Sequence, residues 1–309
     1  MASGYFSHEA CARHDMGEWH PESPARLAAI ADCLRASGLA AELQHHEAEP
    51  VSREDLLRAH PDTHLDAISA LHPEEGLSQV DPDTAMNPHT LDAALRASGG
   101  VAAAVRAVLG GRLANAFCAV RPPGHHAERA LAMGFCFFNN IAVGAHVALA
   151  AGIERVAILD FDVHHGNGTV DIFRDEERVL VCSSFQHPFY PGRLHDLDRP
   201  NIRNTPFDPG TRGPEFRRRL ERDWLPALDA HRPQLLLVSA GFDAHARDPL
   251  GGLELLEPDF RWVTELIADV ARRHAGGRIV SALEGGYALD ALARSVDVHI
   301  QVLREADPG

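Results

Sequence analysis

The sequence predicts an α/β protein in which a mostly parallel sheet is covered on both faces by helices. Apolar runs such as 155–160 and 235–239 show no polar alternation, which is typical of strands buried on both faces. Segments of helical length separate these runs, and strands that alternate with helices favour a parallel sheet. Polar motifs follow four of the predicted strands, at the edge where parallel sheets form their ligand crevice.

Each predicted element follows from an apolar pattern bounded by a start or stop signal. Residues 24–37 are amphipathic, with Pro24 near the start of the helix and Gly38 just past its end. The predicted helices cover 24–37, 53–71, 89–109, 140–152, 214–231 and 258–275. The predicted strands cover 114–120, 155–160, 179–184, 235–239 and 278–283. The chain has no repeat of fixed period and no low-complexity linker, so we expect a single domain over 1–309.

Composition excludes several classes of protein. The net charge of −15, from 44 acidic and 29 basic residues, argues against binding to a nucleic-acid backbone. No apolar run approaches the ~20 residues that span a bilayer, so we expect no membrane partner. The five cysteines are scattered without a CxxC pair, and the first residues lack the pattern of a signal peptide. We therefore expect buried, reduced thiols in a cytoplasmic protein.

Carboxylate and imidazole side chains follow the predicted strand 155–160. Asp162 and His164 are two residues apart, so in an extended segment both project from the same face. With Asp243, which follows the strand 235–239, they give two oxygens and one nitrogen, the ligand count of a catalytic zinc site. The alternative is structural: Asp162 and His164 would anchor a loop, and Asp243 would cap a turn.

Candidate acid–base groups follow the other strand ends. His125 and His126 lie in a proline-stiffened loop after 114–120, and imidazole titrates near neutral pH, as a catalytic acid or base must. Asp160 is placed to orient a histidine. Tyr287 follows the last predicted strand, where a phenol could donate a hydrogen bond to a developing oxyanion. A surface histidine pair and an aromatic lid are the corresponding structural alternatives.

The chain resembles the histone deacetylase and acetylpolyamine amidohydrolase family, which has the arginase–deacetylase fold. Six motifs in family order carry the resemblance: HPESPARL at 20–27, RPPGHHA at 121–127, GFCFFNN at 134–140, DFDVHHGNGT at 160–169, GFDAHARDPLGG at 241–252 and EGGY at 284–287. The forms HPESPARL and HHGNGT resemble the class II branch and its bacterial relatives. The resemblance implies a single domain with a central sheet of about eight strands flanked by helices.

The resemblance also implies a zinc-dependent amidohydrolase. Asp162, His164 and Asp243 would bind one catalytic zinc ion. The family holds a structural potassium ion through nearby backbone oxygens, with Ser183 as a candidate side-chain ligand here. His245 stands where arginase-type relatives have a carboxylate for a second metal, but the chain lacks the further aspartate that a two-metal bridge needs. We therefore expect one zinc ion.

Catalytic roles carry over by position in the motifs. His126 would take a proton from water and then give it to the leaving amine. His125, paired with Asp160, would stay largely cationic or hydrogen-bonded and support His126 electrostatically. Some relatives have aspartate at the position of Asn167, and asparagine here would make His126 less basic. Tyr287 would hydrogen-bond to the carbonyl oxygen of the substrate in the transition state.

The resemblance places a substrate channel beside these groups. Phe135 matches one wall of the acyl-lysine channel, and Tyr190 stands where the opposite wall usually has phenylalanine. Gly134 and Gly286, from two of the motifs, are expected to border it. Polyamine-selective relatives have a glutamate seven residues past the GFD aspartate; here that position is Leu250, which favours acyl-lysine or another neutral-tailed substrate.

The substrate would thus be an N-acetylated lysine or a small acylated amine, and acetate or another acid would be released. The alternatives are an acetylpolyamine deacetylase, a weakly catalytic module that binds acyl-lysine, and a manganese ureohydrolase related to arginase. Asp83 could accept hydrogen bonds from a substrate backbone or simply form a turn. A compact, Ala- and Arg-rich chain favours a bacterial source, and the sequence is compatible with a homo-oligomer.

Overall fold

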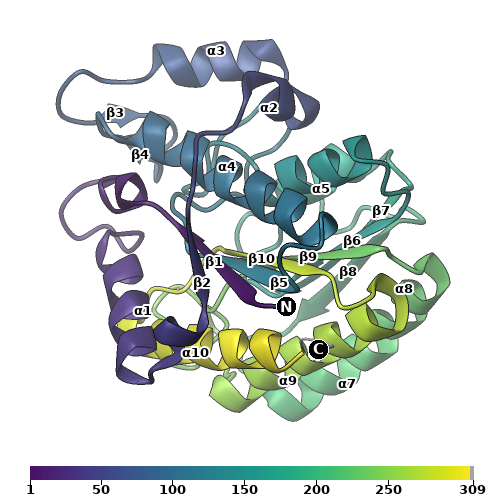
Figure 1. The fold of residues 1–309 in the computed structure, drawn as a ribbon. Helices are drawn as coiled ribbons and strands as arrows, with labels where there is room; N and C mark the ends of the chain where they lie inside the picture. The colour runs from purple at the N-terminus through teal and green to yellow at the C-terminus, as the bar shows by residue number, and fades with distance from the viewer. Residues whose placement is uncertain (307–309) are drawn as a thin grey trace.

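The apolar runs of the sequence form the centre of an eight-stranded parallel sheet in the computed structural model, which describes residues 1–306 (Figure 1). The strands lie in the order β2-β1-β5-β10-β9-β6-β7-β8. Their bounds are β1 Ser3–Ser7, β2 Gln44–Glu47, β5 Asn115–Cys118, β6 Val156–Asp160, β7 Val179–Gln186, β8 Ile202–Phe207, β9 Leu235–Ala240 and β10 Ile279–Leu283. The predicted α/β class is confirmed; residues 307–309 of the predicted domain lie outside the described residues.

The register of the central strands brings their carboxyl ends to one edge of the sheet. Asp160 at the end of β6 lies opposite Ser239 of β9, and Leu283 at the end of β10 lies opposite Ala240. Every residue of β6, β9 and β10 is buried, as expected for strands with helices on both faces. The polar loops that follow these strands therefore start next to one another.

Helices cover both faces of this sheet (Figure 1). Helices α4 (Thr90–Leu109) and α5 (Asn140–Ala150) pack together on one face, with α2 (Arg53–Ala59) and α3 (Asp62–Ala70) beyond them. The other face carries α1 (Ala25–Ala36), α9 (Glu257–Val270), α10 (Leu289–Glu305) and α7 (Gly213–Asp223). The remaining elements are α6 Asn167–Phe173, α8 Leu225–His231, the short helices Glu9–Ala12, Leu39–Glu42 and Ala271–Ala275, and the antiparallel pair β3 Ser78–Gln79 and β4 Ala85–Met86.

Three predicted helices are shorter than the apolar pattern suggested. The segment 53–71 is two helices, because Pro61 disfavours helical backbone at His60, whose φ is −126° and ψ 141°. The segment 214–231 also divides, at Trp224, with Pro226 in the first turn of the second helix. The segment 258–275 leaves α-helical geometry after Val270 and ends in a π-helical turn.

Three strands of the eight-stranded sheet and two α-helices were not predicted. The edge strands β2 (QHHE) and β8 (IRNTPF) carry polar residues on their solvent side, so they lack the continuous apolar run of central strands. Strand β1 has only five residues and begins with Ser-Gly. Helices α6 and α10 also escaped the prediction. Polar and small residues interrupt the apolar run in all three strands, which explains why they were not predicted.

The structure bears on two expectations from composition. None of the helices within residues 1–306 is long and apolar enough to cross a membrane. All five cysteines lie in this range and none of them forms a disulfide; Cys11, Cys118, Cys136 and Cys182 are buried, and Cys33 is partly exposed. The expectation of unpaired thiols is confirmed, and burial holds for four of the five.

A fully buried histidine links α10, α9 and β10. His299 has its Nδ1 2.7 Å from Oγ1 of Thr264 and its Nε2 2.9 Å from Oγ of Ser281. Thr264 donates its own hydroxyl proton to the carbonyl oxygen of Phe260 (2.7 Å), so it accepts from Nδ1. Both nitrogens are thus satisfied in the neutral ring, and burial lowers the pKa of His299 to about 3.

Because burial lowers the pKa of His299, we expect the protein to lose stability in mild acid. Because the folded-state pKa lies below the unfolded value of about 6.5, its contribution is complete above that pH and is lost as pH falls towards 3. We expect the difference in unfolding free energy between the parent and His299→Gln to shrink by about 1.4 kcal/mol from pH 8 to pH 5.5. Urea unfolding at both pH values measures it, and a constant difference would contradict the assignment.

Candidate active site

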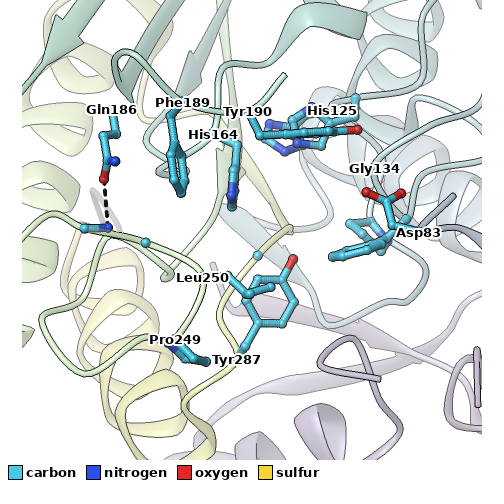
Figure 2. Close-up of a pocket in the computed structure, with 16 residues that line it drawn as sticks. Asp83, His125, Gly134, His164, Gln186, Phe189, Tyr190, Pro249, Leu250 and Tyr287 are labelled. Atoms are coloured by element: carbon cyan, nitrogen blue, oxygen red, sulfur yellow. Dashed lines mark hydrogen bonds between the residues drawn. The ribbon is translucent and has the colours of Figure 1, made fainter. Parts of the chain in front are cut away.

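The loops that follow β5, β6, β9 and β10 meet at a cavity of ≈ 420 Å³ (Figure 2). The cavity is lined by eight of the residues that the sequence predicts for the site: His125, His126, Gly134, Phe135, His164, Tyr190, Leu250 and Tyr287. Asp160, Asp162 and Asp243 are buried beneath it, and Asn167 lies behind His126. Segments more than 100 residues apart in the chain therefore contribute to one site.

Asp162, His164 and Asp243 form a compact cluster at the floor of the cavity. One ligand atom from each lies within 4.8 Å of the others, and Nδ1 of His164 is 3.0 Å from Asp162 Oδ1 and 3.1 Å from Asp243 Oδ2. Backbone amides hold the carboxylates: Val163 N donates to Asp243 Oδ1 (2.8 Å) and Gly285 N to Asp162 Oδ2 (2.8 Å). Any Cβ at Gly285 would clash with Oδ2 of Asp243, so glycine is required there.

The electrostatics of this cluster favour a cation. Burial alone would lower the pKa of His164, but hydrogen bonds with Asp162 and Asp243 raise it to about 10. Burial also raises the pKa of Asp243, with the charge of Asp162 adding to it, to about 7. Zinc takes carboxylate oxygen and imidazole nitrogen as ligands, so the two buried carboxylates and the imidazole of this cluster fit that metal.

His125 and Asp160 form a buried pair beside the cluster. Nδ1 of His125 lies 2.9 Å from Asp160 Oδ2, while Asp160 Oδ1 accepts from the backbone N of Asp162 (3.1 Å). Burial opposes charge on His125, but Asp160 and Asp162 together raise its pKa well above the usual value. Glu284, in the motif EGGY, accepts from the backbone amides of Gly124 (2.7 Å) and His125 (3.1 Å) and holds this loop in place.

His126 has a different environment from its neighbour. Its Nδ1 lies 2.7 Å from Oδ1 of Asn167, which carries no charge. Burial, and then positive charge on His125 and His164, holds the pKa of His126 well below its usual value. Gly134, with φ of +58°, packs against this ring: a Cβ there would lie 2.6 Å from Cδ2 of His126. The surroundings of the two adjacent histidines therefore favour a cationic ring at His125 and a neutral ring at His126.

Tyr287 points its phenol oxygen into the cavity, as Figure 2 shows. Burial raises the pKa of this phenol well above its usual value, so the group is a hydrogen-bond donor at neutral pH. The guanidinium of Arg26 lies 5.0 Å from the centroid of the Tyr287 ring and donates from Nε to the carbonyl oxygen of Gly286 (2.7 Å). Asp248 accepts from the backbone N of Tyr287 (2.7 Å).

Aromatic rings form the walls of the cavity; Figure 2 shows those of Phe189, Tyr190 and Tyr287. Phe135 lines the cavity with a positive φ of 68°, and its ring lies edge-on to Tyr287 with centroids 6.0 Å apart. Tyr190 lines it as well, edge-on to His126 at 5.2 Å. Phe189, which the sequence also suggested as a wall residue, lines the cavity and stacks on His164 with centroids 5.2 Å apart and an interplanar angle of 16°.

The rim and the immediate surroundings complete the list of predicted residues. Leu250 and Asp83 line the cavity. Burial raises the pKa of Asp83 to about 6, and the neighbouring carboxyl group of Asp81 adds to this shift. Gly286 does not line it; Gly285 does, and the Gly286 carbonyl faces Arg26 behind it. His245 stacks on Phe260 (6.2 Å, 3°) with its Nε2 3.5 Å from Glu257, apart from the carboxylate cluster.

Several residues of the site were given no individual role from the sequence. Arg26, Glu284 and Asp248 lie in the quoted motifs, and the signal that could have found them was a charged residue inside an apolar or glycine-rich segment. Gln186, which accepts from the backbone N of Gly252 (2.8 Å), ends a strand predicted to stop at 184. Glu128 directly follows the motif RPPGHHA.

The fold and the site define a class of protein: a parallel α/β protein with a buried carboxylate–imidazole cluster at the carboxyl edge of its sheet. A model of the histone deacetylase domain matches residues 20–303 of the chain. The chain belongs to the histone deacetylase family. The predicted family and its arginase–deacetylase fold are thereby confirmed.

Relatives at moderate identity support a deacetylase or amidohydrolase activity. A histone deacetylase-like amidohydrolase from Pseudomonas aeruginosa is 43% identical over 276 residues, which cover 87% of this chain and 72% of the relative. A probable deacetylase from Archaeoglobus fulgidus is 35% identical over 298 residues, 94% of this chain and 82% of the relative. The crystal structure of the HDA15 HD domain superposes with a TM-score of 0.93 at 34% identity, covering 98% of this chain and 88% of that one.

Proposed function

We propose that this chain is a zinc-dependent amidohydrolase that removes acetyl or other acyl groups from lysine side chains. The observation that carries the proposal is the convergence of a three-ligand cluster, a pair of buried histidines and a phenol on one cavity. Asp162, His164 and Asp243 would hold the zinc ion. When bound, zinc supplies Lewis-acid chemistry: it polarises an amide carbonyl and lowers the pKa of water.

The side chains of the site supply proton transfer and charge stabilisation. His126, whose Nδ1 is occupied by Asn167, accepts the proton of the attacking water at Nε2 and later passes it to the leaving amine. His125 stays cationic beside Asp160 and stabilises negative charge in the transition state. Tyr287 donates its phenolic proton in a hydrogen bond to the carbonyl oxygen as negative charge develops there.

The shape of the cavity supports a slender acyl-amine substrate. Phe135, Phe189 and Tyr190 would flank the aliphatic part of a lysine side chain, which gains from contact with apolar rings. Leu250 at the rim offers no carboxylate to a distal ammonium group, so an acetylated polyamine would gain no ion pair there. We infer that acyl-lysine is the preferred substrate class and that the whole chain acts as one catalytic domain.

A substrate panel tests this proposal. Zinc-loaded protein should hydrolyse an acetyl-lysine peptide faster than an acetylated polyamine, and His126→Ala should lower kcat by about 10²–10⁴-fold. Leu250→Glu should shift the preference towards the polyamine by supplying the missing carboxylate. Binding of acetyl-lysine peptide without hydrolysis would instead identify a binding module, and faster turnover of the polyamine by the parent would overturn the substrate assignment.

Three further expectations stay predictions. A potassium ion near Ser183 would be detected by elemental analysis after dialysis against sodium and potassium buffers in parallel. A cytoplasmic location and the oligomeric state need measurements on cells and in solution. None of the three affects the assignment of acid–base residues above.

A further inference from the structure

Behind His126 lies a chain of polar contacts that ends at the protein surface. Asn167 bonds to His126 through Oδ1 (2.7 Å), and its Nδ2 donates to Oε1 of Glu128 (2.8 Å). The other carboxylate oxygen of Glu128 accepts from Nη2 of Arg193 at 2.9 Å. Asn167 is fully buried, the Glu128 side chain is 9% exposed, and that of Arg193 is 51% exposed. The chain of contacts therefore runs from the cavity wall to solvent.

Three acceptors face Nδ2 of Asn167: Oε1 of Glu128 at 2.8 Å, and the carbonyl oxygen of His126 and Sδ of Met133 at 3.4 Å each. The carboxylate of Glu128 is the nearest and the only charged one, so it has the largest effect on which end of the Asn167 amide faces the histidine. A carboxylate only accepts hydrogen bonds, so the side-chain N–H of Asn167 must point to it. The amide oxygen is then left for His126, and because this oxygen only accepts, Nδ1 of His126 must carry the proton. Turning the amide over would set its oxygen against a carboxylate oxygen at 2.8 Å with no proton between them.

We propose that Glu128 is a positioning residue that, through Asn167, fixes the proton of His126 on Nδ1 and leaves Nε2 unprotonated towards the cavity. This inference rests on the proposed role of His126 as proton acceptor. Asp160 contacts His125 directly, whereas the charge of Glu128 lies one residue further from His126. His125 has the carboxylates of Asp160 and Asp162 close to its two nitrogens, which favours a cationic ring, whereas Nδ1 of His126 meets only an uncharged amide oxygen, which favours a neutral base.

Exchanging the amide and the carboxylate tests the inference. Asn167→Asp places two carboxylates in contact, so kcat should fall by about 10-fold or more with KM nearly unchanged. Adding Glu128→Gln to that variant supplies a side-chain amide that donates to the introduced carboxylate, so the double variant should recover most of the lost kcat. If asparagine merely weakens the base, Asn167→Asp alone would match or exceed the parent, and that result would overturn the proposal.

A second pair of variants separates positioning from general loss of charge. Glu128→Leu removes the acceptor and should lower kcat by about 10-fold. Asp171→Asn is the matched control: it removes a carboxylate from the same helix as Asn167, where Asp171 accepts from the backbone N of Arg129 (3.0 Å), and kcat should stay at the parent value. Equal kcat for Glu128→Leu and the parent would contradict the proposal.

The proton position can also be measured without any turnover. Nitrogen-15 NMR of the zinc-loaded parent should show the His126 ring protonated on Nδ1, with its signals assigned by their absence in His126→Ala. Protonation on Nε2 would overturn the role of Glu128 even in an active enzyme. Conversely, an Nδ1 proton in a protein that hydrolyses no acyl amide would refute the proposed function and leave the positioning role standing.

Discussion

Replacing Tyr287 with phenylalanine is expected to lower kcat for an acetyl-lysine peptide by about 10²–10³-fold, with KM changed little. The substitution removes one hydroxyl group and leaves the ring, so the contacts of the ring with Arg26 and Phe135 persist. The lost hydrogen bond strengthens as negative charge develops on the carbonyl oxygen in the transition state. Its loss therefore lowers kcat and changes KM little. Steady-state kinetics on zinc-loaded protein measure it.

Tyr5→Phe is a matched control for this prediction. Tyr5 is buried in strand β1, outside the residues that line the cavity, so removing its hydroxyl should leave kcat at the parent value. Equal zinc content in all three proteins would exclude loss of metal as the cause. A Tyr287→Phe variant with the kcat of the parent would show that the carbonyl oxygen is stabilised without this phenol.

Replacing Glu22 with glutamine is expected to destabilise the protein by about 3–5 kcal/mol. Among the described residues, Glu22 forms a buried ionic cluster with Arg26, Arg121 and His14, and the substitution removes its carboxylate. Glu22 bonds to Arg121 through both oxygens, one of them at 2.6 Å from Nη2, and to Nη1 of Arg26 at 3.0 Å. Both guanidinium groups are fully buried. Burial opposes ionisation of Glu22, but Arg121 and His14 hold its pKa well below the usual value.

Urea unfolding at pH 7.5 measures this effect, and Glu9→Gln is the control. The Glu9 carboxylate pairs with Arg13 on the surface, where both side chains are more than half exposed, so its loss should change the unfolding free energy little. Arg26 also bonds to the Gly286 carbonyl beside Tyr287, so the Glu22→Gln variant should lose activity at temperatures where it is still folded. A midpoint equal to that of the parent would show that the buried arginines need no anion.

The parts of the site that follow strand ends could be predicted from the sequence alone. Asp162, His164 and Asp243 follow buried apolar runs, and a parallel sheet must bring such ends to one edge. The sequence could not supply the connection between Glu22 and Arg121, which are 99 residues apart and lie in segments without periodic pattern. Pairing of that kind depends on tertiary packing, which local propensity does not encode.

The same limit applies to Glu128 and Asn167. The sequence allowed only the inference that asparagine weakens the neighbouring base, since Glu128 is 39 residues away and its partner could not be read from spacing. In the structure a carboxylate is present near His126, but it belongs to Glu128 and contacts Asn167 instead of the histidine. Likewise, an apolar pattern could not predict the edge strands β2 and β8, because no residue of β2 and only three residues of β8 are buried.

The central claim is that Asp162, His164 and Asp243 hold a single zinc ion on which the activity depends. The most direct test is the metal content per chain. The protein is treated with a chelator, reloaded with equal amounts of zinc and manganese and dialysed, and its metals are then measured by elemental analysis. The account predicts one zinc per parent chain, at most a trace in Asp243→Asn, and activity that follows zinc content. Two manganese ions per chain, or one zinc retained equally by Asp243→Asn, would contradict it.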